Sequence, residues 1–264
     1  MPQLQSLRLS HNVLLRASLC HLAPGSRLTS LDLSSTNLTS LAWRTTDSDC
    51  PEDTDPATLP LLTTLDISNN YLDLAELELR ETLPSLLSIK LGQLNLSSVG
   101  QQETAGLPQS LAEIHISNVP ALEDFQPGAL TQFRELELVV VTGNPALSSL
   151  PPSLLSSPLR SLTLNLSSNG LTWLHPSSLP WTEVALLDLS NNPLHCDCEL
   201  TWLTQLQDLE GAVCASPPAL ANTNISSIDM INMSCSLLRP AQISVLSLLL
   251  VFASLLLGCV SFGK

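Results

Sequence analysis

Aromatic and basic residues are both scarce in this sequence. Phe, Trp and Tyr make up 3% of its 264 residues, and Lys and Arg number 10 against 24 Asp and Glu. With a formal net charge of −14, the chain lacks the basic surface that nucleic acids and anionic lipid headgroups require. We therefore expect no nucleic-acid partner and a core built from aliphatic side chains.

Enzyme motifs are also missing. The sequence contains no G-x-S-x-G, H-E-x-x-H, G-x-G-x-x-G or G-x-x-x-x-G-K-[ST] pattern. Its histidines are scattered along the chain, at His11, His21, His115, His175 and His195. A general base needs a nucleophile within reach, and a lone histidine on a repeat is more often a solvated or contact residue than a catalyst. We expect a protein that is not an enzyme and that holds no cofactor and no metal.

What the sequence does contain is a leucine pattern that recurs roughly every 24 residues, L-x-x-L-x-L-x-x-N-x-L. Its central residues alternate between apolar and polar, which is typical of a short strand with one buried face. About eight copies fill residues 1–194. The apolar strand pairs are Leu7 and Leu9, Leu31 and Leu33, Leu65 and Ile67, Ile89 and Leu91, Ile114 and Ile116, Val139 and Val141, Leu164 and Leu166, and Leu187 and Leu189.

One copy cannot bury its own leucines, so the copies must stack. The predicted fold is α/β: a curved leucine-rich repeat solenoid with a parallel sheet on its concave side. The Asn of the template should point inward and bond backbone groups of the turn. Leu94 and Val119 replace that Asn in two copies, where we expect a looser or bent ladder.

An acidic insertion at residues 45–56 lengthens the step between the second and third copies. A run of acids with proline is typical of an exposed loop. Calcium binding is the alternative, because carboxylates are suitable ligands, but the run lacks the spacing of a calcium loop. Cys50 in this insertion is a candidate to pair with Cys20 in a disulfide.

Four cysteines follow the last copy, at Cys196, Cys198, Cys214 and Cys235. Taken alone they allow three pairings. Residues 187–235 resemble the cysteine-rich C-terminal cap of extracellular leucine-rich repeat proteins such as Toll, connectin and neuronal leucine-rich repeat ectodomains. That resemblance implies the disulfides Cys196–Cys214 and Cys198–Cys235 and a cap over residues 195–235. A zinc site is the competing interpretation, which the C-x-C spacing disfavours.

N-glycosylation sequons accompany these cysteines, at Asn37, Asn95, Asn165, Asn224 and Asn232. Sequons together with paired cysteines indicate the secretory route. The chain nevertheless starts inside a repeat, without the charged start and apolar run of a signal peptide. We expect an N-terminally truncated fragment of a longer protein; targeting by the C-terminal segment is the alternative.

Residues 243–262 form an uncharged apolar run, preceded by a linker at residues 236–242. The run is long enough to cross a bilayer as a C-terminal apolar helix. Two anchors fit it equally well, a single-pass transmembrane helix and a GPI-anchor signal whose tail is removed. Either places the protein at the cell surface, on the extracellular side of the plasma membrane. A soluble core helix is the third alternative.

One outward side chain per strand should form a stripe along the concave face, made of Arg8, Asp32, Asp66, Lys90, His115, Val140, Asn165 and Asp188. The ligand-contact candidates are Asp32, Asp66, Lys90 and His115. The alternative is a solvated row, since interfaces usually carry an aromatic anchor and this stripe has none. A glycan on Asn165 would block its part of the stripe.

The expected function is a membrane-tethered extracellular module for cell adhesion or cell-surface recognition. It would bind a protein ligand or a homophilic partner through the concave face, because solenoid sheets offer large binding surfaces. The alternative is an innate-immune ligand receptor or decoy of the Toll-ectodomain type. A cytosolic scaffold with free thiols is a third possibility.

Overall fold

The computed structural model of the chain describes residues 3–14, 16–18, 22, 26–42, 58–159 and 161–228. The chain divides into two compact units, Met1–Ile228 and Asp229–Lys264, and all described residues belong to the first. Several predicted features lie outside the described residues: the insertion 45–56, Cys20, Cys50, Asn232, Cys235 and the apolar run 243–262. No helix in the described ranges is long and apolar enough to cross a membrane.

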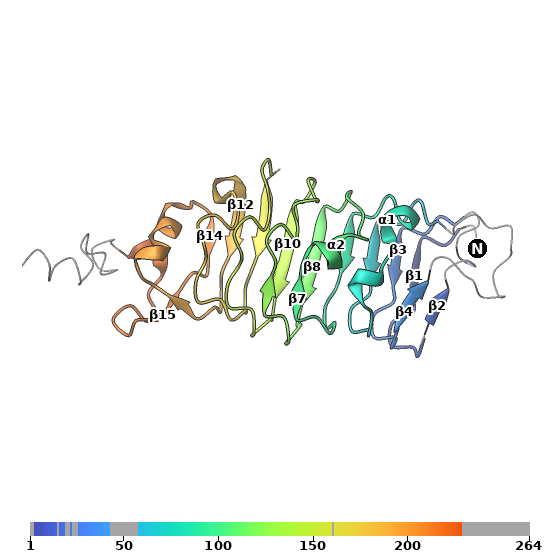
Figure 1. The fold of residues 1–264 in the computed structure, drawn as a ribbon, viewed down its shortest axis with the longest axis horizontal. Coiled ribbons are helices and arrows are strands. Elements are labelled where there is room, and N and C mark those ends of the chain that lie inside the picture. The colour runs from blue at the N-terminus through green and yellow to red at the C-terminus, as the bar shows by residue number, and fades with distance from the viewer. Residues whose placement is uncertain are drawn as a thin grey trace, which may run out of the picture. The chain divides into compact units, whose positions relative to one another are not determined.

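Successive coils place their strands side by side in one parallel sheet (Figure 1), which confirms the predicted repeat architecture. The sheet has nine strands in the order β1-β3-β5-β6-β8-β10-β11-β12-β14. Each strand is short because its coil must turn back within one repeat. The bounds are β1 Ser6–Arg8, β3 Ser30–Asp32, β5 Thr64–Asp66, β6 Ser88–Lys90, β8 Glu113–Ser117, β10 Leu138–Thr142, β11 Leu162–Asn165, β12 Val184–Asp188 and β14 Leu209–Glu210.

The remaining elements are minor and lie in the segments that return from one strand to the next. Three further parallel pairs of strands join neighbouring coils: β2 Arg16–Ser18 with β4 Ser40–Ala42, β7 Ser98–Val99 with β9 Asp124–Phe125, and β13 Leu194–His195 with β15 Cys214–Ser216. The helices are α1 Leu79–Thr82 and α2 Gln101–Thr104, with 3-10 turns η1 Leu74–Glu76, η2 Trp181–Glu183, η3 Cys198–Gln205 and η4 Ile225–Ser227.

The core is a stack of aliphatic side chains, one layer per coil. Leu65 and Ile89 are fully buried, and Leu31 and Ile114 are 1% exposed. Burying a side chain of this size stabilises the fold by roughly 1.5–3 kcal/mol. Because each layer contacts the layers before and after it, stability accumulates from coil to coil along the sheet.

The template asparagines of the inner coils point inward and bond backbone groups of the turn, as predicted, and they also bond the neighbouring coil. Asn70 donates its amide to the carbonyl of Leu33 at 2.8 Å and accepts from the backbone N–H of Thr36 at 3.1 Å. Asn144 accepts from the N–H of Val119 at 2.8 Å, and Asn169 accepts from the N–H of Asn144 at 2.9 Å. These bonds satisfy backbone groups that no strand pairs.

Leu94 and Val119 interrupt the series of inward template asparagines. We expected looser strand pairing at these two copies, but the pairing there is regular. β6, β8 and β10 pair without a register shift. The irregularity falls instead between Leu162 and Thr163, where β11 meets β12. Buried Leu94 and Val119 are 3% and 0% exposed, so apolar packing replaces the missing amide and keeps the coils in register.

The turn that follows each strand contains a residue in the left-handed backbone conformation. The backbone φ is positive at His11, Ser35, Asn69, Gln93, Asn118, Gly143, Ser168 and Asn191, which occupy equivalent places in successive coils. Asn tolerates this conformation better than most residues because its side chain can bond locally. The repetition places a row of polar side chains along the rim of the sheet.

The C-terminal end of the stack is closed by the cap. Cys196 and Cys214 form a disulfide with their Cα atoms 5.6 Å apart, and Cys198 is also disulfide-bonded. Trp202 packs on Trp181 of the last repeat, with ring centroids 4.9 Å apart. β14 adds a strand to the sheet beside β12. The cap therefore covers the last leucine layer with apolar contacts and an added strand, and the disulfide ties two segments of the cap together.

Candidate protein-binding surface

The central outward side chains of the strands lie in register across the whole sheet. Arg8 pairs with Asp32, Asp66 with Lys90, and so on along the sheet. We call this set the outward row: Arg8, Asp32, Asp66, Lys90, His115, Val140, Asn165, Asp188 and Glu210. The four predicted contact residues occupy consecutive strands of this row, so the structure brings them together.

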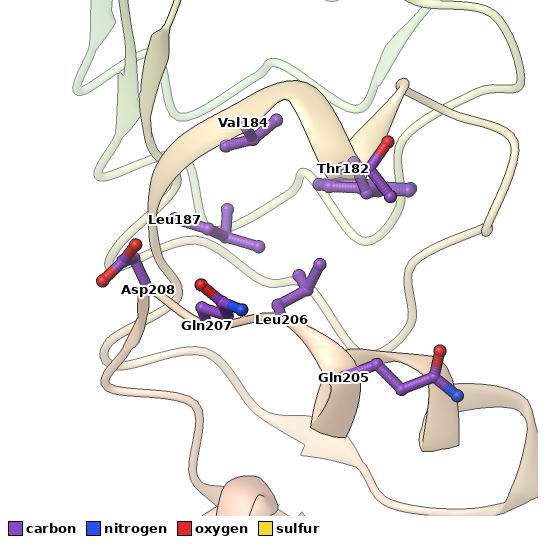
Figure 2. A pocket seen from close by; sticks show the side chains of 8 residues that line it. Thr182, Val184, Leu187, Gln205, Leu206, Gln207 and Asp208 are labelled. Carbon is purple, nitrogen blue, oxygen red and sulfur yellow. The ribbon is translucent and has the colours of Figure 1, made fainter.

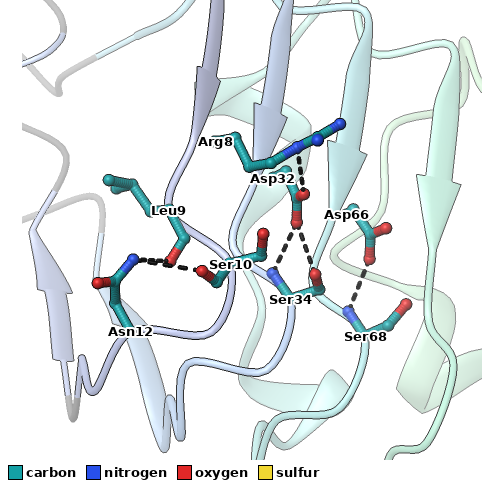
Figure 3. Close-up of polar contacts among 8 residues, drawn as sticks. All are labelled: Arg8, Leu9, Ser10, Asn12, Asp32, Ser34, Asp66 and Ser68. Atoms are coloured by element: carbon teal, nitrogen blue, oxygen red, sulfur yellow. Dashed lines mark hydrogen bonds and ion pairs between the residues drawn. The ribbon is translucent and has the colours of Figure 1, made fainter.

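Several members of the outward row are held by the turn that follows their strand. Asp32 Oδ1 accepts from the backbone N–H of Ser34 at 3.0 Å and from its hydroxyl at 2.6 Å (Figure 3). Asp66 Oδ1 accepts from the N–H of Ser68 at 3.0 Å. The same bond recurs at Asn165 with Ser167 and at Asp188 with Ser190. These oxygens satisfy turn N–H groups, which accounts for the residues without any ligand.

This turn role was missed from the sequence, although a signal was present. Each of these four residues stands two positions before a serine, in the recurring pattern Asp/Asn-x-Ser. Such side chains characteristically accept hydrogen bonds from the backbone two residues on. The pattern therefore separates turn-bonding members of the row from the others.

Asp32 is the most constrained carboxylate of the outward row. Burial acts to raise its pKa, yet hydrogen bonds from Ser34 and Ser10 and the positive charge of Arg8 together hold the pKa below its usual value. Arg8 Nε lies 3.2 Å from Asp32 Oδ2, but the Arg8 side chain is 81% exposed. Solvent therefore screens this ion pair, and the turn hydrogen bonds matter more.

The middle of the sheet face has a different composition. Here the outward row carries Lys90, His115 and Val140, which have no oxygen to accept the turn N–H. We call the surface around them the central patch: Lys90, Glu113, His115, Leu138, Val140 and Thr163. A hollow of about 490 Å³ adjoins it, lined partly by Glu113, Leu138 and Thr163. The patch combines partly exposed apolar side chains with charges at its margin.

His115 and Glu113 lie on the same strand and share a weak contact. His115 Nε2 is 3.7 Å from Glu113 Oε2, too far for a good hydrogen bond. The Lys90 side chain on the neighbouring strand is exposed to solvent. The charges at this margin are consequently available to a partner at little cost in broken internal bonds.

Four sequon asparagines lie in the described residues. Asn37, Asn95 and Asn224 are exposed, whereas Asn165 is half-buried in β11. Asn165 pairs with Val140 in the sheet register, so a glycan there would stand next to the central patch. Such a glycan would leave the N-terminal half of the outward row uncovered.

The cap brings together a serine, a histidine and an aspartate, but not in a catalytic arrangement. His195 Nδ1 is 2.7 Å from Ser216 Oγ, while His195 Nε2 is 3.9 Å from Asp197 Oδ2. The second distance exceeds a hydrogen bond, and the His195 side chain is 54% exposed. A nucleophile needs a base that is itself held in place, so this group is better described as surface hydrogen bonding.

A second hollow lies where the last repeat meets the cap (Figure 2). Its volume is about 410 Å³ and its lining includes Leu187, Leu206 and Asp208. It has no pair of titratable groups for acid–base chemistry. In the described ranges no three His, Cys, Asp or Glu side chains are grouped to hold a metal ion. The sheet face therefore remains the strongest candidate site.

Comparisons with known proteins find relatives of this chain. No family model matches the chain. It is 30% identical over 270 residues to CD180 antigen of Mus musculus, an alignment that covers 98% of this chain and 39% of that protein. It is 36% identical over 100 residues to leucine-rich repeat and fibronectin type-III domain-containing protein 4 of Rattus norvegicus, covering 34% of this chain and 15% of that one.

A solved structure shares the fold. The crystal structure of the mouse RP105/MD-1 complex matches with a TM-score of 0.65 and 26% identity, over 88% of this chain and 38% of that chain. The relatives of this chain are extracellular leucine-rich repeat proteins. The chain spans about two fifths of CD180 antigen and a smaller part of the second relative.

Proposed function

We propose that this leucine-rich repeat chain is an extracellular recognition module that binds a protein partner at the cell surface through its central patch. The observation that carries the proposal is the division of the outward row. Asp32, Asp66, Asn165 and Asp188 serve the turns, whereas Lys90, His115 and Val140 do not. Side chains without a role in the fold are the ones available for a partner.

The chemistry of the central patch suits a protein surface. Protein interfaces combine an apolar centre with a polar rim. Leu138 and Val140 supply outward apolar groups on β10, and Lys90, Glu113 and His115 border them. The partner we expect offers an apolar side chain for β10 and a carboxylate for Lys90, and a second copy of this chain, with its formal net charge of −14, is among the candidates.

The similarity to CD180 antigen favours a second candidate function, an innate-immune ligand receptor or decoy. RP105, the matching solved structure, was crystallised in complex with MD-1. A shared fold makes an equivalent complex of this chain a reasonable hypothesis. Binding of a microbial ligand or of an MD-1-like protein, without aggregation of cells that display the chain, would support this candidate over adhesion.

The remaining parts of this proposal concern the tether. We propose that residues 195–235 form the cap with Cys198 bonded to Cys235, that residues 236–242 link it to the membrane, and that residues 243–262 hold the chain there. Treating intact cells with phosphatidylinositol-specific phospholipase separates the two anchors. Release into the medium indicates a GPI anchor, and retention indicates a transmembrane helix.

The binding proposal is tested on cells that display the full chain. They are exposed to an array of purified ectodomains and to cells that carry a second copy of the chain. Lys90→Glu should weaken the binding of any true partner by roughly tenfold or more, as expected for reversing a charge at an interface. Arg134→Glu makes the same charge change at an exposed site outside the sheet strands and serves as the matched control. Equal binding by both variants would refute the central patch as the site.

A further inference from the structure

Tyr71 is an exposed aromatic residue, whereas most large apolar side chains of the described residues are buried. It is the sole tyrosine of the sequence, and 69% of its surface is exposed. Its backbone N–H donates to the carbonyl of Leu38 at 2.7 Å, which fixes the residue at the rim of its coil. An exposed aromatic side chain marks a contact site more often than an exposed polar one.

Tyr71 shares its place in the repeat with two sequon asparagines. The strand register pairs Leu31 with Leu65 and Leu65 with Ile89. Counting six residues on from each partner gives Asn37, Tyr71 and Asn95. Neighbouring coils are spaced by about 4.8 Å, so Tyr71 stands between two potential glycan attachment sites.

A hollow of about 450 Å³ connects Tyr71 to Asn95, and Asn95 itself is part of its lining. Three exposed amide side chains line the same hollow as Tyr71: Asn69, Gln93 and Asn118. These three are the left-handed residues of successive turns, which explains why their amides form a row. Pro120 also lines the hollow.

This combination of groups suits a sugar better than a peptide or an ion. A pyranose has an apolar face of C–H groups that can lie against an aromatic ring, and hydroxyls that exchange hydrogen bonds with amides. The hollow holds no charged residue, so it offers nothing to an ionic ligand. Its volume lies within the range of small-ligand sites.

We propose that this hollow is a cradle for the N-linked glycan of Asn95, whose first N-acetylglucosamine lies against Tyr71. Attachment replaces one Nδ2–H of Asn95 by a bond to the anomeric carbon of the sugar; the donor is a lipid-linked oligosaccharide, and its lipid diphosphate leaves as the amide proton is lost. Asn95 is the source because it lines the hollow, whereas Asn37 does not. The cradle restrains the glycan and thereby stabilises the coils that contact it.

The test uses the full chain expressed in mammalian secretory cells. Peptide mass spectrometry measures occupancy of Asn95, and thermal unfolding measures Tm. Tyr71→Ala should lower Tm by about 2–4 °C in the glycosylated protein, while Tyr71→Phe should retain the wild-type value. Ser97→Ala removes the sequon but keeps Asn95 and the backbone carbonyl of Ser97, which accepts from the N–H of Glu123 at 2.9 Å. In the Ser97→Ala background, Tyr71→Ala should leave Tm unchanged.

A second readout is independent of stability. A restrained glycan is less accessible to processing enzymes, so the Asn95 glycan of Tyr71→Ala should show more complex-type structures than that of wild type. Leu61→Ala, which truncates an apolar side chain that is 50% exposed and does not line this hollow, is the control. An unoccupied Asn95, or an equal Tm loss with and without the sequon, would overturn the cradle. Neither result bears on binding at the central patch.

Discussion

The first coil and the inner coils carry the same template but bury it to different degrees. Asn70 is 3% exposed and bonded to the neighbouring coil, whereas Asn12 is exposed and bonds the carbonyl of Leu9 in its own turn. Leu65 is fully buried, whereas Leu7, its equivalent in the first coil, is half-buried. The comparison teaches that the template shapes a coil but only the neighbouring coils bury it.

The largest expected effect comes from the leucine layer. Leu65→Ala should destabilise the protein by about 2–5 kcal/mol because it opens a cavity between two packed coils. Leu7→Ala, at the same position in the half-buried first layer, should cost distinctly less. Denaturant midpoints of the two variants measure the difference. Equal losses would mean that the first coil is packed as tightly as the inner ones.

The cap is expected to have the next largest effect. Replacing both Cys196 and Cys214 by Ala removes a disulfide within the cap and should cost about 2–4 kcal/mol. Amide hydrogen exchange should then quicken first in β12 and β14, which would make the last coil resemble the first. Uniform acceleration along the whole sheet would contradict a local role for this disulfide.

The asparagine ladder allows a sharper comparison. Asn70→Ala leaves the N–H groups of Thr36 and Leu38 buried without their acceptor and should cost about 2–3 kcal/mol. Asn12→Ala changes an exposed residue and should cost less than about 0.5 kcal/mol. Thermal unfolding of the Asn70→Ala and Asn12→Ala variants measures this difference in stability. Asn95→Ala, studied in unglycosylated protein, is the control at an exposed asparagine.

The smallest effect should appear as a pH dependence of Asp32→Asn. The pKa of Asp32 is lowered in the folded state from 3.8, so its carboxylate stabilises the fold above that pH and loses this contribution as the pH falls through the folded pKa. The variant should be less stable than wild type by about 1 kcal/mol at pH 7, and the gap should shrink as the pH falls below 3.8 and through the folded-state pKa of Asp32. A gap that persists in acid would assign the loss to packing.

Much of the sheet could be predicted from the sequence because the repeat period sets which residues of neighbouring strands pair. Once Leu31, Leu65 and Ile89 are placed at equivalent positions, their outward neighbours Asp32, Asp66 and Lys90 must align. The inward asparagines follow from the same argument, since buried amides need backbone partners. Which outward side chains bond the turns was harder to predict, although the Asp-x-Ser pattern was present in the sequence.

The sequence by itself determined the coil, its period and the side of each strand that faces the core, because these depend on the alternation of apolar residues within one copy. Tertiary structure alone decided which groups meet between copies. The packing of Trp202 on Trp181, the bond from Thr36 to Asn70 and the position of Tyr71 beside Asn95 all join separate coils. Such contacts depend on how the coils stack, which no single repeat encodes.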